Sequence, residues 1–190
     1  MSITYTNRKG DTYHLHQGIT KKGNPKYYFS KKEPDAPVET IPDGYEIYEN
    51  PNAQVFLRKI PPKLITDVEL AIVRQGIKAY TQVQHSLLDV KKDAIVIYTA
   101  EQDDPFLDQL SSLFAVARQQ IEELLTRHLN YTAVMRFVLS DKQKRTFVAE
   151  RYCFLGSIDD WIQISGPDSL GKLVREYVPH LGQESFFELY

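Results

Sequence analysis

The side chains best suited to chemistry in this sequence are basic and aromatic residues gathered in its first 32 positions. This segment holds seven Lys and Arg residues and one acidic residue, Asp11, so its net charge is +6. Cations interleaved with aromatic rings suit nucleic acid, because cations neutralise phosphates and rings stack on bases. The candidate contact residues are Arg8, Lys9, His14, His16, Lys21, Lys22, Lys26 and Tyr28.

A metal site is the alternative use of the two histidines. His14 and His16 are two residues apart, a spacing that directs both side chains to one face of a strand, where they could share a metal ion. No further ligand stands beside them, and histidines next to threonines are also common on solvated sheet faces. We therefore predict no metal site and no cofactor.

Residues 166–172 match the phosphate-loop pattern G-x-x-x-x-G-K. Leu173, however, stands where that loop needs Ser or Thr to hold magnesium. Asp168 would also place a carboxylate where backbone N–H groups must cradle an anion. We interpret this stretch as a Gly-Pro turn in which Asp168 caps the following helix.

Three further signals for catalysis are weak. Cys153, the single cysteine, lies in a strand-like run and is expected to be a buried hydrophobic residue and not a nucleophile. Asp159 and Asp160 stand at a predicted turn, where aspartates usually bond their own backbone. Asp89 and Lys91 fit the D-x-K part of a metal-dependent nuclease site, but no acidic partner can be identified.

These observations favour a binding protein over an enzyme and leave three functions open. The first is nucleic-acid binding by the basic segment. The second is binding to another protein. Lysines at turn tips are often only solvated and also protect sheet edges from pairing, so the basic segment need not contact nucleic acid. The third is a hydrolase or nuclease whose site lies in residues 64–190.

Composition is that of an ordinary globular protein, with 42% hydrophobic and 25% charged residues. One cysteine excludes an internal disulfide, and no run approaches the roughly 20 apolar residues of a membrane helix. The first residues lack the apolar stretch of a signal peptide. We expect no membrane partner and a cytoplasmic location.

The basic segment predicts a three-stranded antiparallel meander, with turns near residues 8–11 and 21–25. Alternation predicts an apolar face with Ile3, Tyr5, Tyr13, Leu15, Tyr27 and Phe29, and a polar face with Thr4, Thr6, His14, His16 and Tyr28. Residues 45–59 predict a hairpin around an Asn-Pro-Asn-Ala turn, in which Asn52 suits the left-handed region. The proline-rich residues 33–42 predict a linker.

Parts of this segment resemble a known family. The residues that carry the resemblance are 7–10, 12–16, 44–52 and 55–59 (NRKG, TYHLH, GYEIYENPN and VFLRK). They are similar to a family of uncharacterised prokaryotic proteins, over about residues 1–60. The resemblance implies no activity and bears only on the domain boundary.

The remainder predicts helices mixed with hairpins. Thr66 and Glu69 form a capping box that starts a helix to about Tyr80. Further elements are expected as a hairpin over 86–99, a long helix over 105–129, strands over 131–139, 146–155 and 161–165, a helix from 170 to Pro179, and a short strand or tail over 185–190. Without regular βαβ alternation, the predicted fold class is α+β. We expect two domains, a basic β module over 1–60 and an α+β domain over 64–190.

Overall fold

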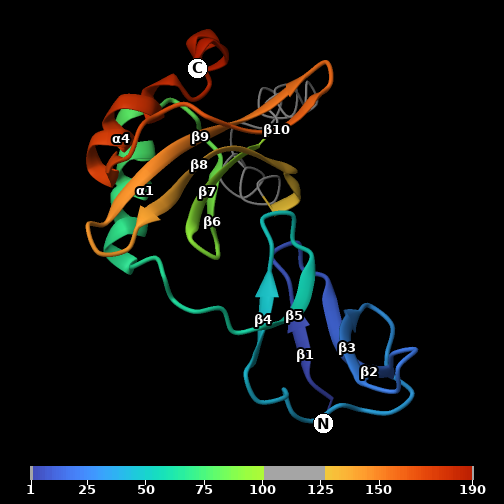
Figure 1. Cartoon of the computed structure of the whole chain (residues 1–190). Coiled ribbons are helices and arrows are strands. Elements are labelled where there is room, and N and C mark those ends of the chain that lie inside the picture. Colours follow the sequence, from blue (N-terminus) through green and yellow to red (C-terminus); the bar gives the residue numbers. More distant parts are fainter. Residues whose placement is uncertain (1, 101–126, 190) are drawn as a thin grey trace, which may run out of the picture. The chain divides into compact units, whose positions relative to one another are not determined.

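The computed structural model describes residues 2–100 and 127–189, and it has a mixed α+β fold built mainly from antiparallel sheets (Figure 1). The chain divides into two compact units, residues 1–61 with 104–129, and residues 62–103 with 130–190. Of the predicted helix over 105–129, only its end lies within the described residues, where 127 and 128 are helical.

The first unit contains a three-stranded sheet and a separate hairpin. The meander is formed by β1 (Thr4–Thr6), β2 (Thr12–Ile19) and β3 (Pro25–Ser30), in the order β1-β2-β3. The hairpin pairs β4 (Tyr45–Glu49) with β5 (Val55–Lys59). Both predictions are confirmed, because turn chemistry and two-residue alternation depend on neighbouring residues alone.

The register confirms the predicted faces of the three-stranded sheet. Tyr5 stands opposite Tyr13 and Leu15 opposite Phe29, so these residues share one face. Leu15 is fully buried there. The intervening residues of each strand therefore lie on the other face.

Two details of the first unit differ from expectation. In the β4–β5 turn the left-handed residue is Ala53, with φ of 62°, and not Asn52. Asn50 Oδ1 accepts the N–H groups of Asn52 and Gln54, at 2.9 and 3.0 Å, and this fixes the turn. The expected linker over 33–42 has no helix or strand but is not detached, since Val38 is buried and its carbonyl accepts the Ile3 N–H at 2.9 Å.

The second unit is organised around a six-stranded antiparallel sheet. Its main path runs β10-β9-β8-β7-β6, and β11 pairs with β9. The strands are β6 (Ser86–Lys91), β7 (Ala94–Ala100), β8 (Tyr131–Asp141), β9 (Thr146–Leu155), β10 (Ile158–Gln163) and β11 (Asp168–Ser169). The strand predicted over 161–165 therefore begins earlier, and Asp159 and Asp160 are strand residues, not turn residues.

Two helices and two short 3-10 helices complete this unit. They are α1 (Asp67–Tyr80), α4 (Leu170–Tyr177), η1 (Val178–His180) and η2 (Glu184–Glu188). The predicted capping box of α1 is confirmed. The C-terminal segment was expected as a short strand or tail; the strand is wrong, because residues 184–188 form η2.

Both helices pack on the same face of the sheet and enclose its core (Figure 1). Strand residues such as Ile95 and Phe137 are fully buried against Val73 of α1 and Val174 of α4. The helices approach so closely that a Cβ on Gly76 would lie 2.1 Å from Val174 Cγ1. The glycine is therefore required by this contact.

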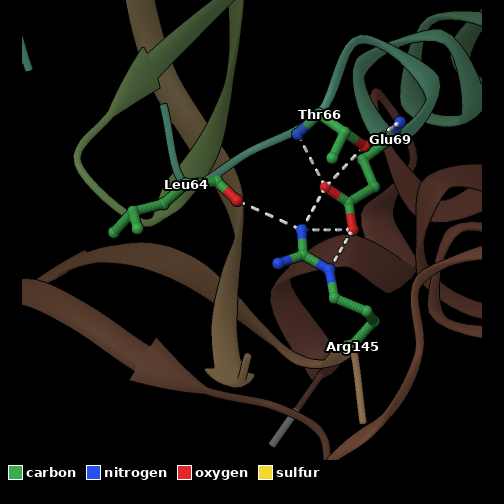
Figure 2. Close-up of polar contacts among 4 residues, drawn as sticks. All are labelled: Leu64, Thr66, Glu69 and Arg145. Carbon is green, nitrogen blue, oxygen red and sulfur yellow. Dashed lines mark hydrogen bonds and ion pairs between the residues drawn. The ribbon is translucent and has the colours of Figure 1, made fainter. Parts of the chain in front are cut away.

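A polar network attaches the start of α1 to the β8–β9 turn (Figure 2). The Arg145 guanidinium donates to both carboxylate oxygens of Glu69 and, at 3.1 Å, to the Leu64 carbonyl. Glu69 also accepts the Thr66 N–H at 2.8 Å. Arg145 adopts φ of 53°, a left-handed conformation that costs a non-glycine residue about 1 kcal/mol.

Candidate nucleic-acid-binding surface

The eight predicted contact residues all lie in the first unit, where they occupy one sheet face and the turns at its two ends. The face is the polar side of the meander. In the register, His16 stands opposite Tyr28 and Gly18 opposite Lys26, so these side chains project on the same side as His14. We call His14, His16, Lys26 and Tyr28 the stacking face.

Tyr28 is the centre of the stacking face. Its side chain is exposed, at 44%, although it is a large aromatic residue. The His16 ring stacks on it with centroids 5.1 Å apart and planes 15° from parallel. The Lys26 Nζ lies 5.9 Å from the tyrosine centroid. The arrangement places a cation beside a ring surface that water still reaches.

His16 has a fixed ring orientation. Its Nε2 lies 2.9 Å from the Lys32 carbonyl oxygen, which fits an N–H donated to that oxygen. The ring is therefore held in one orientation, in which it stacks on Tyr28. His14, two residues earlier, is partly exposed on the same face.

Lys21 and Lys22 project from a well-ordered turn between β2 and β3. The Thr20 N–H donates to the Asn24 carbonyl at 2.8 Å, and the Gly23 N–H donates to the Thr20 carbonyl at 2.9 Å. Gly23 has φ of 82°, which a glycine adopts without strain. Both lysines are exposed at the tip, so their charges face solvent.

Arg8 is placed differently from the other predicted residues. It lies in the β1–β2 turn, where its guanidinium donates to the carbonyls of Pro51, Arg127 and Leu129. Its backbone N–H donates to Glu49 at 3.0 Å. These bonds hold parts of the first unit together, so we leave Arg8 out of the proposed surface. Lys9, the next residue, is partly exposed.

The same turn region also contacts the β4–β5 hairpin. Asn7 Nδ2 donates to the Ala53 carbonyl at 2.7 Å, and the Tyr5 hydroxyl donates to Glu49 at 2.9 Å. Burial and the Glu49 carboxylate raise the pKa of Tyr5, so its hydroxyl stays protonated as the donor. The β1–β2 turn is thus bonded to the β4–β5 hairpin.

Sequence reasoning identified most of the stacking face but not its arrangement. Lys26 was expected to contact phosphate, and its position beside the Tyr28 ring was missed. Two-residue spacing from Tyr28 is the signal that would have placed it on this face. Lys31 is less available, since it forms an ion pair with Asp11 at 2.8 Å.

The phosphate-loop pattern of the second unit forms no cradle. Lys172 Nζ is paired with the Asp168 carboxylate at 2.5 Å, and this pairing lowers the pKa of Asp168. The residue that caps α4 is Ser169, not Asp168 as predicted, and it makes no side-chain capping bond. The Lys172 ammonium group is therefore paired with a carboxylate four residues earlier in the chain.

Of the remaining catalytic signals, Cys153 of β9 stands opposite Asp160 of β10, whereas Asp89 and Lys91 lie on β6. Cys153 is 5% exposed within β9, as expected of a hydrophobic residue. Asp89 and Lys91 share one face of β6, opposite Val96 and Ala94 of β7. Asp159 accepts the Tyr152 hydroxyl, which raises the pKa of Tyr152. Over residues 2–100 and 127–189, no group of three His, Cys, Asp or Glu side chains is arranged to hold a metal.

Comparison with known proteins does not extend these observations. The chain matches no protein-family model, no curated protein and no solved structure. In the part of the chain that the structure describes, no helix is long and apolar enough to span a membrane.

Proposed function

We propose that the first unit binds single-stranded nucleic acid through the stacking face and the adjacent lysine turn. The observation that carries this proposal is the exposed Tyr28 ring, which stacks with His16 and has the Lys26 Nζ 5.9 Å from its centroid. An aromatic platform beside cations is the arrangement by which proteins hold unpaired bases and their backbone.

Each part of the surface has a distinct task. Tyr28 offers a face on which a base stacks, a contact worth about 1–3 kcal/mol and tolerant of sequence. Lys21, Lys22 and Lys26 neutralise phosphates, and Lys9 extends the positive charge at the other end of the sheet. A duplex keeps its base faces stacked inside, so the ring favours single strands.

The test is fluorescence anisotropy with labelled single-stranded and duplex oligonucleotides over a salt series. With about four phosphate contacts, log K against log salt should slope by about −3 on single strands. Tyr28→Ala should cost about 1–3 kcal/mol of binding free energy on single strands and much less on duplex. Lys21→Glu with Lys22→Glu should weaken binding to all sequences.

The matched control reverses two exposed turn lysines of the second unit, Lys142 and Lys144. Their replacement by glutamate should leave binding unchanged, although the net charge falls by the same amount. Absence of binding at about 50 mM salt and micromolar protein would reject the proposal. So would an equal loss in the control variant, because binding would then follow net charge alone.

A protein partner is the second candidate. It is favoured by exposed apolar residues of the first unit, Ile19 at 78%, Ile60 at 57% and Phe56 at 45%. Exposed apolar groups of this size are typical of contact sites when they gather into a patch. If nucleic acid does not bind, Ile19→Ser and Phe56→Ser can be compared with the native chain by light scattering for loss of self-association.

A further inference from the structure

The second unit contains a cavity of about 440 Å³ between the β8–β10 part of its sheet and residues 181–187. We propose that this C-terminal cavity binds a small, uncharged, mainly apolar molecule. Its lining includes Cys153, Ile158, Ile162, Leu181 and Phe186. The inference is independent of the nucleic-acid proposal, because every lining residue belongs to the second unit.

The walls of the C-terminal cavity are held in place by polar bonds. Arg151, 5% exposed, donates from Nε to the Leu189 carbonyl at 2.8 Å and from Nη2 to the Phe187 carbonyl at 3.3 Å. Thr81 Oγ1 donates to the Leu181 carbonyl at 3.2 Å. These bonds fasten the C-terminal segment to β9 and to the end of α1, so the wall cannot simply collapse onto the sheet.

The size of the cavity points to an occupant. Protein interiors are close-packed and leave few voids larger than a water molecule. A volume of about 440 Å³ lies instead within the range of ligand pockets, about 300–1,000 Å³. The site is preformed, which reduces the ordering cost of binding.

The chemistry of the lining selects the class of ligand. Most lining side chains are aliphatic or aromatic, with Thr99 and Gln183 among the few polar groups. Arg151 is the one charged side chain among the described lining residues, and its bonds to the Leu189 and Phe187 carbonyls hold the cavity wall. An ionic ligand would lose hydration against apolar walls, which is costly, so an uncharged molecule fits best.

One lining aromatic is exposed in a way the fold does not require. Phe187 is 69% exposed. A large apolar ligand in the cavity would cover part of its ring and recover the free energy of removing it from water. Exposed apolar groups grouped at a cavity are typical of binding sites.

The experiment uses the full chain and the neutral fluorescent probe N-phenyl-1-naphthylamine, whose emission rises in apolar surroundings. We expect saturable binding with one site. Phe187→Ser should lower affinity about tenfold, equivalent to about 1.4 kcal/mol of lost apolar contact. The ring is exposed, so this variant should stay folded. The control is Val68→Ser on α1, a residue 70% exposed and outside the cavity lining, which should change nothing.

Chemical shifts of the backbone amides and side-chain methyl groups then locate the probe. Addition of the probe should move the signals of Ile158, Ile162 and Leu181 and leave those of the first unit unchanged. Absence of saturable binding would overturn the proposal. Shift changes confined to residues outside the lining, or equal losses in Val68→Ser and Phe187→Ser, would overturn it as well.

Discussion

Glu69 is a nearly buried carboxylate, 8% exposed, that contributes to two structures at once. It completes the capping box of α1 and accepts the guanidinium of Arg145 from a turn 76 residues away. Burial by itself raises the pKa of Glu69, but the bonds from Arg145 and Thr66 outweigh burial, so the net pKa lies below its usual value. The charged form is therefore the one the folded protein stabilises.

The first prediction is that Glu69→Gln lowers the free energy of unfolding by about 1.5–3 kcal/mol at pH 7, because a charged hydrogen-bonded pair is lost. A carboxyl whose pKa is lowered by folding contributes stability that is complete above its unfolded pKa, about 4.3, and lost as pH falls through the folded value. The difference in unfolding free energy between the native chain and Glu69→Gln should therefore shrink below about pH 4. Urea denaturation from pH 7 to pH 3 measures this difference.

Asp67 provides the control, because it stands in the same helical turn and is also ion-paired. Its partner is Lys63 at 2.7 Å, but the two side chains are 80% and 69% exposed. Asp67→Asn should change stability by no more than about 1 kcal/mol, since exposed pairs contribute little. Equal effects of the two substitutions would show that the Arg145 contact adds nothing.

At the scale of elements, the contact between α1 and α4 decides how the helices cover the sheet. Gly76 is a poor residue for a helix interior, costing about 1 kcal/mol relative to alanine. It is nevertheless buried in α1, and Val174 Cγ1 occupies the place where a Cβ would stand. Close packing between the two helices thus outweighs helix propensity.

The second prediction is that Gly76→Ala destabilises the protein by about 1–3 kcal/mol, through overpacking against α4. Val174→Ala should relieve the clash, so the double variant should be less destabilised than the two single effects added together. Thermal and urea unfolding of the four proteins measure this coupling. Strict additivity would mean that the two positions do not touch.

Gly171→Ala in α4 is the matched control for that experiment. A Cβ at Gly171 meets no atom within 4 Å, so the same substitution should be neutral or stabilise by up to about 1 kcal/mol. The same glycine-to-alanine substitution is therefore expected to lower the free energy of unfolding at position 76 and to leave it unchanged or raise it at position 171.

At the scale of the whole molecule, charge is unevenly distributed along the chain and the two units differ in construction. Residues 1–32 carry a net charge of +6, whereas residues 64–190 carry −5. In the described residues, the first unit has a small sheet and a hairpin, and the second a six-stranded sheet covered by two helices. We propose that they are separate domains, between which the chain passes three times, first near Pro61 and Pro62.

The third prediction follows from that division. Brief trypsin digestion of the native protein should cut first near Lys63, which is exposed, or after Lys31 or Lys32 before the proline-rich stretch. Mass spectrometry of the earliest fragments identifies the sites. Early cleavage confined to residues 105–129 would contradict the proposed domains.

The sequence alone determined the features that depend on neighbouring residues. The meander, both hairpins and the α1 capping box were predictable because alternation, turn residues and capping operate over a few positions. The polar face with His14, His16 and Tyr28 followed from the same alternation. Local rules failed at two places where more than one local structure suits the residues. Residues 184–188 form η2 in place of the expected short strand, and Ser169 caps α4 in place of Asp168.

Only the tertiary structure decided what distant segments do to one another. Arg8 was predicted to meet phosphate, but its guanidinium donates to backbone carbonyls brought beside it by folding. The partner of Glu69, the need for glycine at position 76 and the C-terminal cavity likewise depend on segments far apart in the chain. No local pattern encodes such pairings, because each depends on the packing of whole elements, and packing is settled by the sum of many weak contacts.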